Sequence, residues 1–262
     1  MNNVHQTLYI PLYGKAYVSK KGILLRDPMS EKIWSQQGFP LKGKAKSKWL
    51  AYYMGMRSAV FDRWLSAEME ELPEAVVLHI GCGLDSRVCR LGARGRLWYD
   101  VDFPEVIRER RRYYSASDSY HMIGADAREG AWLDEIPAGR DAIVVMEGVS
   151  MYFQREELLR LLASLTSHFS FVSILMDCYT VFAAKASKYK NPINEVGVTQ
   201  LYGVDCPEEL EAGTDLLFTA ERELTPGDLV GQLKGFERVF FWTMFAGAPA
   251  KKIYRLFEYR KK

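Results

Sequence analysis

Three carboxylates occur where successive β-strands are expected to end: Asp102, Asp126 and Glu147 each close or follow an apolar stretch. In an open parallel sheet the carboxyl ends of the strands share one edge, and ligands bind just outside that edge. Carboxylates gathered there repel polyphosphates but accept hydrogen bonds from cationic groups and hydroxyls. The chemistry of this edge therefore favours a ligand without phosphates.

A glycine turn at 81–86, Gly-Cys-Gly-Leu-Asp-Ser, precedes these carboxylates. Its glycines, Gly81 and Gly83, let the backbone approach a ligand closely. Ser86 replaces the third glycine of a dinucleotide fingerprint, which disfavours a pyrophosphate cradle. Asp102 follows Gly83 at about the 20-residue offset of a ribose-binding acid. S-adenosylmethionine, with a sulfonium, an ammonium and a ribose diol, is the cofactor that this pattern predicts.

Alternating elements are expected to position these residues. Helical segments separate five apolar stretches, which predicts a doubly wound, mostly parallel α/β sheet. The five stretches are 75–80, 96–102, 120–126, 142–148 and 171–177. Further strands at 214–224 and 251–261 bring the number to seven, the arrangement of a Rossmann-like methyltransferase sheet rather than a six-stranded dinucleotide domain.

All of 1–262 is expected to form one methyltransferase domain. Apolar residues recur at helical spacing in 26–37 and 46–72, within a helical N-terminal extension. The predicted parts are the extension at 1–73, a cofactor-binding core at 74–177, a helical cap insertion at 178–213 and C-terminal strands and helix at 214–262.

Composition excludes several function classes. A net charge of +2 is too small to indicate a nucleic-acid partner. No apolar run of about 18 residues indicates a membrane span, and the N-terminal stretch lacks the pattern of a secretory signal, so a cytoplasmic location is expected. The four cysteines show no CxxC spacing, so we expect neither a metal site nor disulfides. The oligomeric state stays open.

Four motifs in order resemble the leucine carboxyl methyltransferase family, which includes bacterial tetracenomycin-type polyketide carboxyl O-methyltransferases. The motifs are Gly81-Cys-Gly-Leu-Asp-Ser-Arg87, Trp98-Tyr-Asp-Val-Asp-Phe-Pro-Glu-Val-Ile107, Gly124-Ala-Asp-Ala-Arg128 and Glu147-Gly-Val-Ser-Met-Tyr-Phe153. The resemblance covers about residues 20–179. It implies a class I methyltransferase that uses S-adenosylmethionine.

The resemblance also implies roles for single residues around S-adenosylmethionine. Asp102 would bind the ribose hydroxyls, and Asp126 with the Ala127 backbone would meet the adenine edge. Gly81 and Glu147 would lie beside the methionine moiety and its ammonium. Without the family, Asp102 could instead cap the following helix, and Asp126 could be a turn residue.

Basic residues ahead of the first strand complete the implied cofactor site. Arg57 would clamp the methionine carboxylate, although a helix arginine also commonly forms a surface ion pair. A lysine ahead of an early Asp-Pro pair would join it. Lys21 is the candidate because Asp27-Pro28 follows, and Lys20 is an equal alternative.

The predicted reaction is methyl transfer to a carboxylate of a small molecule or of a peptide C-terminus. A carboxylate is ionised at neutral pH, so it needs no general base, whereas a phenol of pKa about 10 benefits from one. No residue stands out as such a base, and the catalytic residues stay unknown. Tyr152 and Tyr179 follow strand ends and could line the acceptor pocket. Lys185, Lys188 and Lys190 could attract an anion or form a solvated helix face.

Two other function classes stay open at this point. An NAD(P)-dependent reductase is disfavoured by Ser86 and by the lack of a Tyr-x-x-x-Lys pair. A non-catalytic S-adenosylmethionine-binding module is compatible with the same residues, because methyl transfer requires no diagnostic catalytic side chain.

Overall fold

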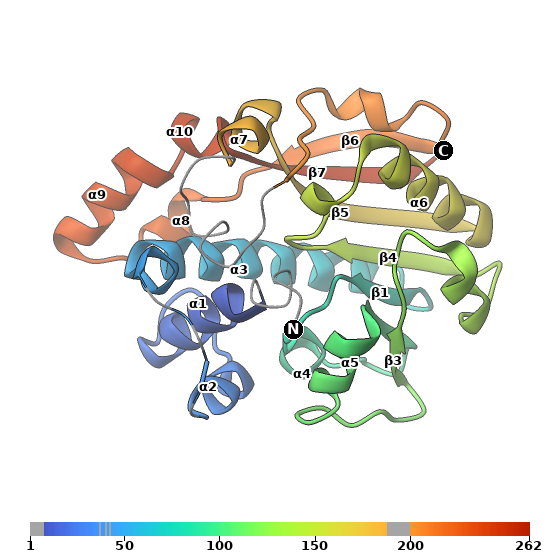
Figure 1. Ribbon diagram of the computed structural model, residues 1–262, viewed down its shortest axis with the longest axis horizontal. Helices are drawn as coiled ribbons and strands as arrows, with labels where there is room; N and C mark the ends of the chain where they lie inside the picture. Colours follow the sequence, from blue (N-terminus) through green and yellow to red (C-terminus); the bar gives the residue numbers. More distant parts are fainter. Residues whose placement is uncertain (1–7, 37, 40, 42, 188–199) are drawn as a thin grey trace.

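The strands of the computed structural model form one seven-stranded sheet in the order β3-β2-β1-β4-β5-β7-β6 (Figure 1). The model describes all residues except 1–7, 37, 40, 42 and 188–199. The strands are β1 (Val76–Ile80), β2 (Trp98–Asp102), β3 (Tyr120–Gly124), β4 (Asp141–Met146), β5 (Phe171–Tyr179), β6 (Leu216–Arg222) and β7 (Tyr254–Lys261). Strands β1 to β5 pair in parallel, and β7 runs antiparallel to both of its neighbours. The predicted seven-stranded, mostly parallel α/β sheet is confirmed.

Helices surround this sheet and also precede it. The α-helices are α1 (Tyr9–Lys20), α2 (Pro28–Trp34), α3 (Lys48–Glu71), α4 (Arg87–Leu91), α5 (Pro104–Arg110), α6 (Arg155–His168), α7 (Val181–Ala186), α8 (Gly227–Val230), α9 (Gly235–Phe245) and α10 (Ala248–Lys251). Short 3₁₀ turns are η2 (Gly43–Lys46), η3 (Gly130–Glu135), η4 (Ser150–Tyr152) and η6 (Pro207–Leu210). The helices expected at 26–37 and 46–72 correspond to α2 and α3, with ends trimmed by a few residues.

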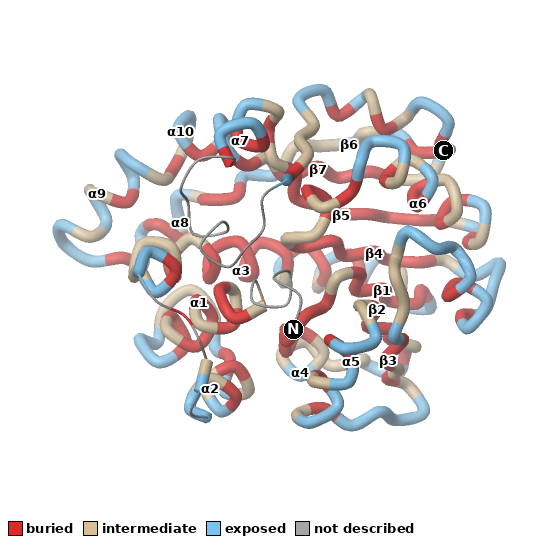
Figure 2. The backbone as a smooth tube through the Cα atoms, viewed as in Figure 1, coloured by how far each residue is buried: buried red, intermediate tan, exposed pale blue. Residues whose placement is uncertain are grey.

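The two faces of the sheet pack against different helices, because side chains alternate along each strand. Val76, Leu78 and Ile80 share a core with residues of α6 and η3. Val77 belongs to the other core, which includes α1 and α3. Both the sheet and the long helix α3 are largely buried (Figure 2).

Polar residues are buried on the α3 face of the sheet. His79 pairs in register with Asp100 on the neighbouring strand, and Asp177 lies near the end of β5. All three are at most 1% exposed. Since buried charges require partners, this face must carry a network of ion pairs, and that network forms the base of the site.

Candidate active site

The glycine turn after β1 adopts a backbone that other residues would strain. Gly81 and Gly83 have φ values of +69° and +52°. A Cβ on Gly81 would lie 2.6 Å from Cγ2 of Val149. Both glycines line a small cavity of about 70 Å³. The turn therefore brings backbone, rather than side chains, to the edge of the sheet.

Asp102 connects the end of β2 to this turn. Its Oδ2 accepts a hydrogen bond of 2.8 Å from the backbone N–H of Gly83. Its Oδ1 accepts one of 2.8 Å from the N–H of Phe103, the residue that precedes α5. Asp102 thus lies at the glycine turn as the sequence indicated, although it does not line the small cavity itself.

Asp126 lies in a turn beyond the sheet. Strand β3 ends at Gly124, two residues earlier than expected. The Asp126 carboxylate accepts hydrogen bonds from the backbone N–H and the guanidinium of Arg128, and this pairing lowers its pKa. Ala127 packs against the core on the α6 side. Neither Asp126 nor Ala127 lines the small cavity at the glycine turn or the larger cavity that adjoins it.

Glu147 is held by two arginines beside the glycine turn. Its Oε1 accepts hydrogen bonds of 3.0 Å from Arg57 Nε and from the Ser58 hydroxyl. Its Oε2 pairs with Nη2 of Arg87. Although burial disfavours ionisation, Arg87 and Arg57 lower the pKa of Glu147 to about 2. The alternative of a surface ion pair for Arg57 does not hold, because this arginine is only 4% exposed.

A second buried carboxylate, Asp177, lies on the other side of Arg57. Arg57 Nη1 donates to Asp177 Oδ2 at 3.1 Å and to the Tyr254 hydroxyl at 3.0 Å. Asp177 also accepts a hydrogen bond of 2.7 Å from the backbone N–H of Gly148. Burial raises the pKa of Asp177 to about 6. Sequence reasoning missed its role, although it ends a predicted strand just as Glu147 does.

The lysine at the glycine turn is Lys15, not the predicted Lys21. Lys15 is 2% exposed, lines the small cavity and pairs with Asp85 at 2.9 Å. Lys21 instead contacts Tyr52 and Glu237 and lines neither cavity, and Lys20 lines neither as well. The sequence did contain a signal for Lys15, because it follows Leu12 by three residues and so lies on the apolar face of a helix.

Ser86 has a structural explanation of its own. It is fully buried, and its hydroxyl donates a hydrogen bond to Oδ1 of Asp27. The same hydroxyl accepts a hydrogen bond of 3.0 Å from Nη1 of Arg90. Asp27 in turn caps α2 through the N–H of Ser30 at 2.9 Å. A glycine at position 86 would break this link between the glycine turn and the N-terminal helices.

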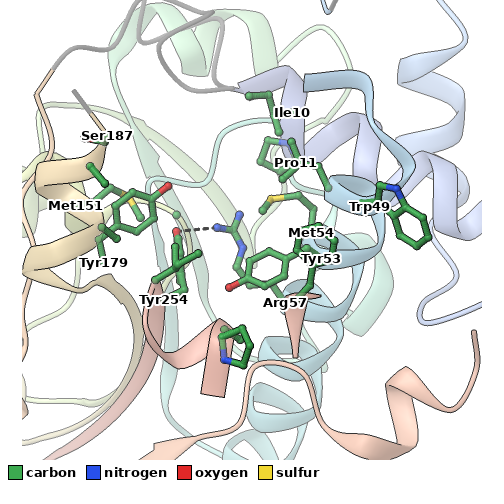
Figure 3. A pocket seen from close by; sticks show the side chains of 18 of the residues that line it. Ile10, Pro11, Trp49, Tyr53, Met54, Arg57, Met151, Tyr179, Ser187 and Tyr254 are labelled. Carbon is green, nitrogen blue, oxygen red and sulfur yellow. Dashed lines mark hydrogen bonds between the residues drawn. The ribbon is translucent and has the colours of Figure 1, made fainter. Parts of the chain in front are cut away.

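A larger cavity of about 560 Å³ opens beside the small one (Figure 3). Its lining is mostly apolar and aromatic and includes both predicted acceptor residues, Tyr152 and Tyr179. The side chain of Arg57 projects between Tyr254 on one wall and Met54 on the other (Figure 3). The two cavities share three lining residues: Pro11, Arg57 and Gly148.

The expected cap insertion at 178–213 divides into separate parts. Phe182 and Ser187 line the larger cavity from the segment that contains α7. Leu210 of η6 instead packs into the core on the α6 side. Residues 188–199, with Lys188 and Lys190, lie outside the described residues, and Lys185 is exposed without lining the cavity.

In the described part of the chain, no group of three or more His, Cys, Asp and Glu side chains is placed to hold a metal ion. Within the same residues, no helix combines the length and apolar character required to cross a bilayer.

Known proteins with similar sequences are methyltransferases. The tetracenomycin polyketide synthesis O-methyltransferase TcmP of Streptomyces glaucescens is 29% identical over 214 residues, which cover 81% of this chain and 79% of that protein. The S-adenosyl-L-methionine-dependent methyltransferase dpfgK of Gibberella zeae is 27% identical, with 94% of this chain and 93% of that protein covered. These relatives favour a methyltransferase over the reductase alternative.

Solved structures resemble this fold at low sequence identity. A DUF574 family protein from Streptomyces avermitilis has a TM-score of 0.61 and 12% identity, covering 89% of this chain and 95% of that chain. Magnesium protoporphyrin IX methyltransferase from Synechocystis, solved with bound S-adenosylhomocysteine, has a TM-score of 0.50 and 14% identity, covering 98% of this chain and 100% of the other. Both likenesses concern the fold alone.

The family is settled by a match over most of the sheet and the helices before it. Residues 10–166, which run from α1 into α6, match the leucine carboxyl methyltransferase family. The matched range includes the glycine turn, Asp102, Arg57 and Glu147. The chain therefore belongs to the leucine carboxyl methyltransferase family and is an S-adenosylmethionine-dependent methyltransferase.

Proposed function

We propose that this protein transfers the methyl group of S-adenosylmethionine to the carboxylate of an apolar small molecule. One observation carries the proposal: a charged cavity at the glycine turn and a large apolar cavity meet at Arg57 and Gly148. The first suits the charged methionine end of the cofactor. The second suits an apolar acceptor, and the two would meet where methyl transfer requires them to.

The residues around the glycine turn fit the cofactor. Lys15 and Arg57 supply buried positive charge for its carboxylate, and Glu147 supplies negative charge near its ammonium. Gly81 and Gly83 allow the backbone to approach the cofactor closely. Asp102 would accept hydrogen bonds from the ribose hydroxyls. Asp126 and Ala127 are proposed for the adenine edge.

A carboxylate acceptor agrees with the groups that line the larger cavity. When bound, the cofactor supplies an electrophilic methyl group. The methyl group would pass to a carboxylate oxygen, and the electron pair of the broken carbon–sulfur bond would stay on sulfur. No proton moves, so no base is needed. Burial raises the pKa of Tyr179 and of Tyr254, so both hydroxyls stay protonated and could donate hydrogen bonds to a carboxylate.

The apolar lining favours a small hydrophobic acid over a peptide C-terminus. A cavity of about 560 Å³ falls in the range of about 300–1,000 Å³ for small-molecule sites. Aromatic walls give ring systems a large contact area. The relative TcmP, named for a polyketide pathway, is consistent with an acceptor of this kind.

A direct test offers radiolabelled S-adenosylmethionine with either anthracene-2-carboxylate or 2-anthrol. We expect label on the acid, released as methanol by mild alkali because a methyl ester hydrolyses. Alkali-stable label on the phenol would contradict the carboxylate acceptor. Tight binding of S-adenosylhomocysteine with no transfer to any acid, phenol or peptide would instead favour a non-catalytic binding module.

A further inference from the structure

The hydroxyl of Tyr53 is buried and has no hydrogen-bond partner within the described chain. Buried hydroxyls in native proteins are almost always hydrogen-bonded. Tyr53 also lines the larger cavity. An unpaired donor beside a cavity indicates that a group from outside the described residues completes its hydrogen bonding.

The position of Tyr53 places this donor next to the junction of the two cavities. Tyr53 lies four residues before Arg57 on α3, so both side chains emerge from the same face of the helix. Its ring meets that of Tyr254 edge to face, with centroids 6.2 Å apart (Figure 3). Tyr53 therefore lines the larger cavity together with Arg57, which is one of the residues at the junction of the two cavities.

Tyr53 can donate but does not act as a base. Burial raises the pKa of its hydroxyl, and the nearby Arg57 charge does not offset this effect. The neighbouring guanidinium also has a free position: Nε and Nη1 of Arg57 are bonded, whereas Nη2 has no hydrogen-bond partner among the described residues. Two donors on one helix face thus lie next to the larger cavity.

We propose that Tyr53 is a positioning residue whose hydroxyl donates a hydrogen bond to the acceptor oxygen that does not attack the methyl group. This inference rests on the proposed function. The bond orients the carboxylate so that its second oxygen faces the small cavity. An acceptor without such an oxygen leaves the hydroxyl unpaired and binds more weakly.

The melting temperature of Tyr53→Phe separates the proposed role from a purely structural one, which predicts that the melting temperature falls. Tyr53→Phe removes a buried polar group that no described residue satisfies, so the melting temperature should stay equal or rise. Affinity for S-adenosylhomocysteine, measured by calorimetry, should also stay equal. Only the acceptor should be affected, with KM for anthracene-2-carboxylate rising about 10- to 100-fold, as for a hydrogen bond to a charged group.

The matched control is Tyr113→Phe, since Tyr113 bonds Glu109 at the surface and lines neither cavity. This variant should keep the wild-type KM. A second control compares ligands in calorimetry: anthracene, which lacks oxygen, should bind wild type and Tyr53→Phe equally, whereas the acid should distinguish them. That pattern assigns the loss to the oxygen–hydroxyl contact.

An unchanged KM and an unchanged affinity for the acid in Tyr53→Phe would overturn the inference. A falling melting temperature with weaker S-adenosylhomocysteine binding would also overturn it, since that result marks a structural role. Failure of the proposed function is separate, because it requires wild type to methylate 2-anthrol and not the acid. In that case the inference is overturned as well, because 2-anthrol has no second oxygen to which Tyr53 could donate.

Discussion

The two cavities that meet at Arg57 and Gly148 are built in opposite ways. The small cavity is surrounded by charges that are already paired with one another, such as Lys15 with Asp85. The large cavity is walled by apolar and aromatic side chains and contains an unpaired hydroxyl, that of Tyr53. One region is ordered before any ligand arrives, whereas the other depends on its ligand for completion.

This difference separates two kinds of contribution. Buried ion pairs fix the orientation of donors and acceptors in advance, which lowers the reorganisation needed on binding. Apolar walls contribute by excluding water and selecting shape. Substitutions around the small cavity should therefore change stability and cofactor affinity together, and those around the large cavity should change acceptor choice alone.

The largest effect is expected for Arg57→Met, which acts on both cavities. The substitution leaves Asp177 buried without its cation, and breaking a buried pair costs about 3–5 kcal/mol. We expect urea unfolding to report a loss of this size, together with much weaker S-adenosylhomocysteine binding. Arg63→Met, at an exposed ion pair, is the control and should change stability by less than about 1 kcal/mol. Equal stabilities for the two variants would contradict the proposed network.

Asp102→Ala should separate cofactor binding from the acceptor cavity. Loss of charge-assisted hydrogen bonds to ribose should weaken S-adenosylhomocysteine binding about 10- to 100-fold in calorimetry. Asp118→Ala, at an exposed position, should keep the wild-type affinity. If both variants bind S-adenosylhomocysteine equally well, Asp102 has only a structural role, in which its hydrogen bond from Gly83 connects the glycine turn to β2.

Asp177 gives the charged region a distinctive pH dependence. Its folded-state pKa of about 6 exceeds the ordinary value near 4. The folded protein therefore holds more protons than the unfolded one between these values, and wild-type stability falls as pH rises through this range. Asp177→Asn lacks this titration. We expect its free energy of unfolding, relative to wild type, to rise by up to about 3 kcal/mol from pH 4 to pH 7. A constant difference across these pH values would show that Asp177 titrates normally.

The smallest effect is expected at the rim of the aromatic cavity. Phe182 lines it but is 68% exposed, so Phe182→Ala should change stability by no more than about 0.5 kcal/mol. Widening the rim should favour bulkier acids over anthracene-2-carboxylate in competition assays, with S-adenosylhomocysteine affinity unchanged. A change in cofactor affinity would mean that the two cavities are not separable.

Local sequence rules predicted the sheet and the acids at its edge, because strand periodicity and the parallel arrangement place Asp102 and Glu147 at one edge. The partners of these acids depend on long-range contacts. Lys15 and Asp85 are 70 residues apart, and Arg57 and Asp177 are 120 apart. No local pattern pairs residues over such distances.

The placement of Lys15, rather than Lys21, at the glycine turn has a related cause. The proximity of Lys21 to Asp27-Pro28 along the chain suggested a role, but the rotation of about 100° per residue in α1 decides which lysine faces the turn. Lys15 lies on that face and Lys21 does not. The aromatic cavity was still less predictable, because residues from α1, α3, α7, α9, α10 and β7 build it together.

The most direct test of the account is a crystal structure with S-adenosylhomocysteine and anthracene-2-carboxylate bound together. We expect the cofactor carboxylate beside Lys15 and Arg57, its sulfur at Gly148, and the rings of the acid between Tyr179 and the α3 wall with one carboxylate oxygen on Tyr53. An acid bound outside the larger cavity, or a cofactor whose sulfur points away from Gly148, would contradict the claim that donor and acceptor meet where the two cavities join.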